Sequence, residues 1–282
     1  MQAGRALAAS FFAAPRLAAL LVPLALACGS TGVGNPNAPE PGTLSLAIVS
    51  DDELDEAAAP ANAVTGDTTT ALGVDPMAPV EPLPRALLQR AVLVLGSVRW
   101  LPCDAAAEVV TQTGPFVVDL LGGVMRPALP PFQVPEAGVC GFDAPLAPAR
   151  DSAELLGRSL LFSGERPDGV RFVLFANMRA TLRVRPARGQ AWAGEGDLAL
   201  LWALRPRRWA AAKELADETP SDAGGQRTLV IDVDRHPLLF ALIRTRLASQ
   251  SGLFFDRDGN GVLDAADRSA GEVGTGTTDP EQ

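Results

Sequence analysis

The sequence has few of the side chains that usually carry out catalysis. One histidine, His236, and one lysine, Lys213, occur among 282 residues, and tyrosine is absent. No Gly-x-Ser-x-Gly, His-Glu-x-x-His or phosphate-loop pattern occurs, which argues against common hydrolases and zinc enzymes. Because His236 precedes a proline at an expected helix start, we favour a capping or surface role over a catalytic one. We therefore predict that the protein is not an enzyme, although a carboxylate pair of glycosidase type stays open.

Acidic residues outnumber basic ones by 33 to 24, which gives a formal net charge of −9. This charge disfavours nucleic acid and anionic membrane as main partners and suits cation binding. We interpret the acidic run 51–56 as a solvated segment, with a second cation site as the alternative. Six arginines lie close together, and we favour edge-strand protection over an anion-binding patch for them. They are Arg183, Arg185, Arg188, Arg205, Arg207 and Arg208.

Residues 1–27 have the features of a secretory signal peptide, with early arginines and then an apolar run. That run of about 11 residues is too short to span a bilayer, which takes about 20. It ends in Leu-Ala-Leu-Ala-Cys, which resembles the lipobox of bacterial lipoproteins and implies that Cys28 is the lipidated mature N-terminus. The alternative is an ordinary signal peptide with an incidental cysteine. By the same resemblance, Gly29 after the cysteine favours the outer membrane of the cell envelope, on either face.

Residues 28–42 contain many Gly, Pro and Asn residues and predict a flexible tether. Short apolar segments separated by Gly and Pro then predict a mainly β fold, an antiparallel β-sandwich over residues 43–235. Residues 51–85 predict a disordered insert within it. A short helix is expected at 209–216. The expected strands are 43–50, 90–101, 114–121, two within 132–145, 159–165, 170–177, 180–185, 197–204 and 228–234.

The clearest expected strand is 90–101, where strict alternation places Val92, Val94, Val98 and Trp100 on one face. Gly96 falls on the same face, and glycine inside a strand indicates a bulge or close packing.

Two cysteines remain after Cys28, and both lie beside expected strands. In an exported protein Cys103 and Cys140 are most simply a disulfide. The alternative, a pair of reactive thiols, lacks a nearby histidine or a Cys-x-x-Cys spacing.

The most specific pattern is the segment 254–267, FFDRDGNGVLDAAD. Its oxygen-bearing residues occupy the ligand positions of an EF-hand calcium loop, and Gly261 supplies the sharp turn. The last position carries aspartate instead of glutamate, which reduces reach and affinity and resembles dockerin-type loops. The predicted calcium ligands are Asp256, Asp258, Asn260, the backbone carbonyl of Val262, Asp264 and Asp267.

The expected C-terminal unit, residues 236–271, is a helix, this calcium loop and a short exit helix. The first helix is predicted at 237–250 and is expected to end at Ser251-Gly252, before the loop. Because no second loop is present to pair with it, we predict a static calcium site instead of a sensor. Residues 272–282 are expected to be a disordered tail.

Lipobox, tether, β-rich domain and calcium loop, in this order, resemble uncharacterised lipoproteins of Gram-negative bacteria with an immunoglobulin- or transthyretin-like sandwich. The resemblance implies a fold and a cellular address but no activity. We therefore predict a non-enzymatic, lipid-anchored envelope protein with a structural calcium ion and a binding or surface-structure role. Its expected partners are the membrane, through the lipid, and an unidentified protein or glycan. The alternatives are a calcium-stabilised carbohydrate-active hydrolase and a dockerin-like assembly module.

Overall fold

The computed structural model describes residues 42–51, 80–150, 154–187, 191–192, 196–223 and 226–280. All of them belong to one unit of the chain, Pro39–Gln282. The expected signal peptide, Cys28, most of the tether and residues 52–79 of the expected insert lie outside the described residues. Within these ranges no helix is long and apolar enough to cross a membrane.

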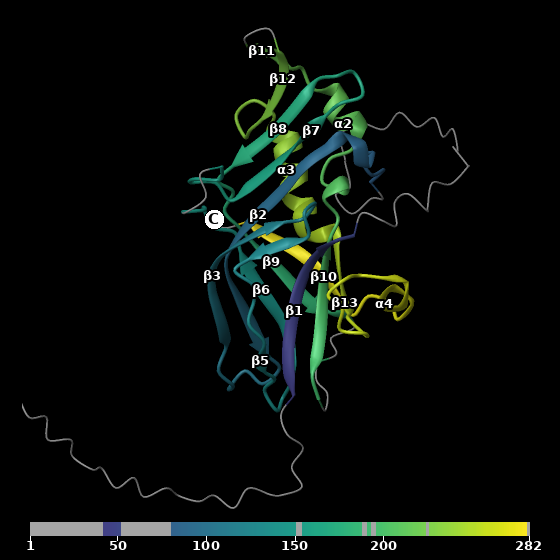
Figure 1. The fold of residues 1–282 in the computed structure, drawn as a ribbon. Helices are drawn as coiled ribbons and strands as arrows, with labels where there is room; N and C mark the ends of the chain where they lie inside the picture. The colour runs from purple at the N-terminus through teal and green to yellow at the C-terminus, as the bar shows by residue number, and fades with distance from the viewer. Residues whose placement is uncertain are drawn as a thin grey trace, which may run out of the picture. The chain divides into compact units, whose positions relative to one another are not determined.

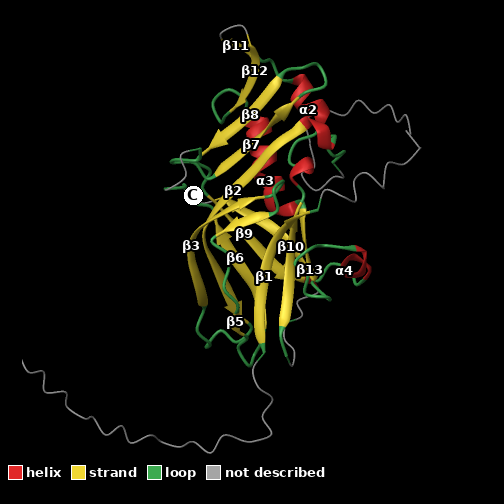
Figure 2. Ribbon diagram, in the orientation of Figure 1, coloured by secondary structure: helices red, strands yellow, loops and turns green. Residues whose placement is uncertain are grey.

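The fold is mainly β, as the sequence predicts (Figure 2). The strands are β1 Thr43–Ser50, β2 Leu88–Pro102, β3 Val110–Asp119, β4 Val124–Arg126, β5 Phe132–Gln133, β6 Val139–Pro145, β7 Leu160–Glu165, β8 Arg171–Ala176, β9 Ala180–Pro186, β10 Leu198–Leu204, β11 Ser221–Ala223, β12 Gln226–Ile231, β13 Ser251–Phe255 and β14 Gly274–Pro280. The helices are η1 Arg85–Leu87, η3 Pro206–Arg208, α2 Ala212–Asp217, α3 Pro237–Ser249 and α4 Ala265–Ser269.

These strands form one curled mixed sheet, whereas the sequence predicts an antiparallel sandwich (Figure 1). The hydrogen-bonded order is β11-β12-β8-β7-β2-β6-β9-β14-β13-β10-β1-β5, with β3 and β4 branching from β2. The pairs β1–β10 and β8–β12 are parallel, so the prediction of a purely antiparallel fold was wrong. The parallel pair β1–β10 agrees with the burial of β10. The last five residues of β10 are all buried, and burial on both faces is typical of parallel strands.

The main apolar core contains the inward side chains of most strands together with one side of α3. Within this core the ring centroid of Phe142 lies 5.0 Å from that of Trp100 and 5.2 Å from that of Trp202. Leu239 and Ile243 of α3 are buried in the same cluster. The aromatic rings thus connect the parallel part of the sheet, through β10, with its antiparallel part, through β2 and β6.

The long strand β2 changes its buried face at Gly96. Leu93 and Leu95 belong to the main core before the glycine, and Val98 and Trp100 belong to it afterwards. The pairing with β3 shifts register between Leu95 and Ser97, as in a β-bulge. The predicted bulge is confirmed, but the predicted single face was wrong because the extra residue reverses the alternation. Val92 and Val94 instead contribute to a separate apolar cluster.

The C-terminal region contains more strand than the sequence predicts. The helix α3 ends at Ser249, as expected from Ser251-Gly252, and β13 then separates it from the loop. Residues 274–280 form β14, which pairs with β9 and β13, so the expected tail is not disordered there. Gly276 permits close packing of α3, because a Cβ at this position would lie 2.5 Å from the carbonyl oxygen of Ala248.

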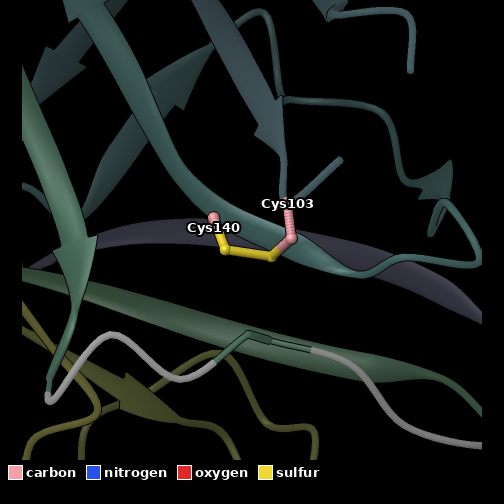
Figure 3. Close-up of a disulfide and its surroundings, with 2 residues drawn as sticks. All are labelled: Cys103 and Cys140. Atoms are coloured by element: carbon pink, nitrogen blue, oxygen red, sulfur yellow. A yellow bond between two sulfur atoms is a disulfide. The ribbon is translucent and has the colours of Figure 1, made fainter. Parts of the chain in front are cut away.

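The predicted disulfide between Cys103 and Cys140 is confirmed (Figure 3). Cys140 lies on β6, and Cys103 directly follows β2. The bond joins neighbouring antiparallel strands near the position where their pairing becomes irregular.

Candidate functional site

The predicted calcium loop connects two adjacent strands of the sheet, β13 and β14, by way of α4. Phe254 and Leu263 anchor its two sides in a small apolar cluster with Leu201 and Ala203 of β10. The N–H of Asp256 donates to the carbonyl oxygen of Ala199, 2.9 Å away. The loop is therefore held against β10 by these apolar contacts and by this hydrogen bond.

The carboxylate of Asp256 lies inside the curve of the loop. Its Oδ1 accepts hydrogen bonds from the N–H groups of Gly259 (2.8 Å) and Asn260 (3.2 Å). Its Oδ2 accepts from the N–H of Gly261 at 2.9 Å. Gly261 has φ +73°, a conformation that glycine adopts without strain. Gly261 thus stands in the turn that the sequence predicts, and the chain bends around the carboxylate of Asp256.

Asp258 and Asn260 lie side by side on the exposed side of the loop. The Nδ2 group of Asn260 donates to Oδ2 of Asp258 at 2.7 Å, and Oδ1 of Asn260 accepts from the N–H of Val262 at 2.6 Å. The Val262 side chain is itself exposed. Calcium coordination by Asn260 would require its amide oxygen to turn from this N–H toward the ion.

Asp264 and Asp267 close the loop. Oδ1 of Asp264 caps α4 by accepting from the N–H groups of Ala266 and Asp267. The carboxylate of Asp267 is buried, with 1% of the residue exposed. It accepts from the N–H of Arg257 at 2.9 Å and from the N–H of Asp264 at 3.1 Å. One buried side chain therefore bridges the start and the end of the loop.

The donor set fits a hard cation, because every predicted ligand atom is an oxygen. None of the ion pairs found among the described residues involves the four aspartates of the loop, so no arginine neutralises them. In the described conformation no three His, Cys, Asp or Glu side chains of this region, or elsewhere in the described chain, converge as a metal cluster. Backbone N–H groups of the loop instead bind both oxygens of Asp256 and both oxygens of Asp267, which fixes the orientation of these two carboxylates.

An ion-pair network around the buried Asp51 connects the end of the loop, at Arg268, to the sheet. Asp51, which follows β1, is 2% exposed, and its carboxylate binds Arg205 Nε at 2.8 Å and Arg268 Nη2 at 3.0 Å. Arg205 also binds Glu272 at 2.8 Å. Burial favours a lower pKa for Arg205, but the hydrogen bonds that it donates to the carboxylates of Glu272 and Asp51 hold its pKa above the ordinary value. Asp51 therefore belongs to a structural network and not to a solvated charge run.

Three other arginines of the predicted cluster have separate structural contacts. Arg185 binds Asp143 at 2.7 Å and Arg183 binds Asp279 at 2.6 Å, both across neighbouring strands. Arg207 is buried and donates through Nε to the carbonyl oxygen of Leu83. These contacts do not assemble the six arginines into one anion-binding patch, and Arg188 lies outside the described residues.

His236 directly precedes α3, as expected, and its Nδ1 lies 2.7 Å from Oε2 of Glu218. This contact ties the start of α3 to the end of α2. It gives the only histidine a structural partner. His236 stands at the N-cap position of α3, but its side chain makes no capping hydrogen bond and is 10% exposed, so the contact with Glu218 takes the place of the predicted capping or surface role.

A groove of about 440 Å³ lies beside the calcium loop, and the sequence gives no signal of it. Residues 261–263 form one wall, and residues 120–123, at the β3–β4 turn, contribute another. Arg85, Arg207 and Arg268 also line it. We refer to it as the arginine groove. Its parts come from five separate segments of the chain, so no local pattern could reveal it.

A second cavity of about 580 Å³ lies over β2, β3 and β4. Its lining contains two carboxylates, Asp119 and Glu154, and three arginines, Arg90, Arg126 and Arg150. Glu154 pairs with Arg90 at 2.9 Å on the surface.

Comparison with known proteins adds no assignment. No protein family, no curated protein and no solved structure matches the chain.

Proposed function

We propose that the protein is a non-enzymatic, lipid-anchored protein of the bacterial envelope in which one calcium ion stabilises the C-terminal part of the sheet. Lipid on Cys28 would hold the chain at the outer membrane, and the folded region would act as a binding or surface-structure module. The calcium ion would be a structural component and take no part in chemistry.

The orientation of the loop carboxylates is the observation that carries the calcium proposal. Asp256 and Asp267 turn into the loop, and Asp267 joins its two ends although it is almost fully buried. Four aspartates within twelve residues repel one another, and no arginine or lysine among the described residues pairs with them. A divalent cation would relieve this repulsion and hold the connection between β13 and β14.

The test is thermal unfolding of the mature domain with EDTA or with calcium. For a Kd of about 10⁻⁴ M, about 2 mM free calcium would add about 2 kcal/mol to the free energy of unfolding. For a domain of this size that corresponds to a rise in Tm of about 5 °C. Magnesium at the same concentration should raise Tm less, because it requires a tighter octahedral site. An unchanged Tm between EDTA and millimolar calcium would refute the structural calcium site.

The membrane part of the proposal has its own test. Mass spectrometry of the protein isolated from membranes should find Cys28 as the first residue, carrying acyl chains. A Cys28→Ser variant should be released into the soluble fraction, because the anchor is covalent lipid. An unmodified Cys28, or cleavage elsewhere, would contradict lipid anchoring.

A carbohydrate-active hydrolase is the second candidate, because Asp119 and Glu154 share the 580 Å³ cavity. Glycosidases need two carboxylates flanking the bond that is cleaved. Screening the protein against chromogenic glycosides, with Asp119→Asn and Glu154→Gln as matched variants, distinguishes the candidates. Turnover that both substitutions abolish would replace the non-enzymatic proposal.

A further inference from the structure

We propose that the arginine groove binds a phosphate monoester that carries a small apolar group. The groove of about 440 Å³ falls within the range of small-molecule sites, about 300–1,000 Å³. Its lining combines three guanidinium groups with aliphatic side chains.

The charge of the groove points to an anion. Arg85, Arg207 and Arg268 line it, and no aspartate or glutamate does. Such an excess of positive charge is unusual in a chain whose net charge is −9. Guanidinium groups bind phosphate oxygens with two parallel hydrogen bonds, which suits a phosphate dianion better than a single carboxylate.

Arg85 is the arginine of the groove that is open to a ligand, because it is exposed and no ion pair holds its side chain within the described residues. The other two are held by the protein and contribute positive charge. Arg268 binds Asp51 through Nη2 and its Nε is buried, and Arg207 donates to the Leu83 carbonyl.

The apolar part of the lining indicates what the phosphate carries. Leu121 and Val262 both line the groove, and they are 39% and 58% exposed. A small aliphatic or aryl group between them would cover both side chains. No aromatic residue lines the groove, so it offers no ring on which a base can stack.

Calcium should strengthen this binding, and this part rests on the proposed calcium site. Residues 261–263 form a wall of the groove and also the middle of the calcium loop. Four loop aspartates repel a nearby dianion, and a bound calcium ion would cancel half of their charge. By linkage, phosphate and calcium must then each raise the affinity for the other by the same factor.

The experiment is isothermal titration calorimetry of the mature domain with phenyl phosphate. Binding is expected in EDTA and should be several-fold tighter in calcium, while phenol, the same aryl group without the phosphate, should not bind measurably. Arg85→Ala should weaken phenyl phosphate binding about tenfold, because one charge-assisted contact is lost. Arg126→Ala is the matched control, since it removes an arginine from the other cavity and should leave affinity unchanged.

A second variant tests the wall. Val262→Asp places a carboxylate opposite the arginines without removing a predicted calcium-ligand atom, and it should abolish phosphate binding. Calcium binding measured without phosphate on each variant separates the two proposals. A chain that binds phosphate but not calcium refutes only the calcium site. A chain that binds calcium with no effect on phosphate refutes the coupling.

A flotation assay distinguishes a free ligand from a lipid headgroup. Vesicles of phosphatidylcholine with about 20% phosphatidic acid should retain the domain through Arg85 if the groove accepts a phosphomonoester headgroup. If the vesicles retain the domain but phenyl phosphate does not bind, the result would still support the groove as a phosphate site and would identify the ligand as a lipid headgroup. Failure of both probes, or retention that Arg85→Ala does not reduce, would overturn the proposal.

Discussion

Arg268 and Asp51 are 217 positions apart in the sequence, and the Nη2 group of one donates to Oδ1 of the other at 3.0 Å. Asp51 directly follows β1, and Arg268 follows the last predicted calcium ligand by one residue. The pair therefore connects the candidate site to the sheet independently of the backbone. Arg268 also lines the arginine groove. It therefore belongs to the ion-pair network and to the groove, and it directly follows the loop.

Arg268→Ala should lower the free energy of unfolding by about 1–2 kcal/mol, because a buried carboxylate loses one of its two cationic partners. Asp51→Ala should cost more, about 3 kcal/mol, because it removes the acceptor for both arginines. Urea unfolding measures both values. Arg183→Ala is the control, since its ion pair with Asp279 is about half exposed and should contribute less than about 1 kcal/mol. Equal losses in all three variants would show that the network has no special role.

Asp258→Ala should separate calcium affinity from folding. Asp258 is an exposed predicted ligand, so its removal should change the stability of the calcium-free protein by less than about 0.5 kcal/mol. The calcium Kd should rise about tenfold or more, because one charged ligand is lost. Asp217→Ala removes the same charge from an exposed position on α2 and should change neither quantity. Calorimetric calcium titrations of the three proteins provide the comparison.

The sequence predicts local features well where neighbouring residues determine them. The strand β1 was predicted with its observed bounds, and the break after α3 follows from Ser251-Gly252. The parallel pairing of β1 with β10 was missed, because alternation in a single strand contains no information about its neighbour. β14 was missed because its glycines and threonines resemble a linker, whereas Gly276 is required for close contact with α3.

The candidate site divides in the same way. The loop from Asp256 to Asp267 could be predicted because the proposed calcium ligands all lie within twelve residues of the sequence. The partners of Asp51 and the arginine groove could not be predicted, because their residues meet only after the sheet has curled. A single sequence offers no signal that joins Arg85 to Val262.

The contact between Asp197 and Thr43 should make stability depend on pH. The Thr43 hydroxyl donates to Oδ1 of Asp197 at 2.6 Å and the Thr43 N–H donates at 3.0 Å, and these bonds lower the pKa of Asp197 below 3.8. A lowered pKa in the folded state stabilises the fold above pH 3.8, and this stabilisation disappears as pH falls through the folded-state pKa.

Thr43→Val should therefore destabilise the protein at neutral pH, and the difference from the unmodified protein should shrink below pH 3.8. Urea unfolding across the pH range measures the difference. Thr111→Val, at an exposed position of β3, should show a constant difference at every pH. A constant difference for Thr43→Val would contradict the proposed linkage.

Loss of the disulfide should destabilise the fold throughout. Cys103 and Cys140 are separated by 37 positions, and a loop of this length corresponds to about 4 kcal/mol of restricted unfolded-state entropy. The Cys103→Ser/Cys140→Ser variant should lose about this amount in urea unfolding. A reductant should destabilise the unmodified protein similarly and leave the double variant unchanged, which excludes an effect of the reductant itself.

Gly96→Ala tests the bulge that reverses the buried face of β2. A Cβ at Gly96 would lie 2.9 Å from the Cβ of Ala147, closer than such atoms approach in folded proteins. One of the two segments must then move, and the expected loss of stability is about 1–3 kcal/mol. Ala147→Gly removes the atom that the new methyl group meets, so Gly96→Ala should cost clearly less in that background. A double-mutant cycle by urea unfolding gives the coupling energy, which should be favourable to the double variant. If the two substitutions are additive, the glycine serves the backbone conformation of the bulge and not its close packing.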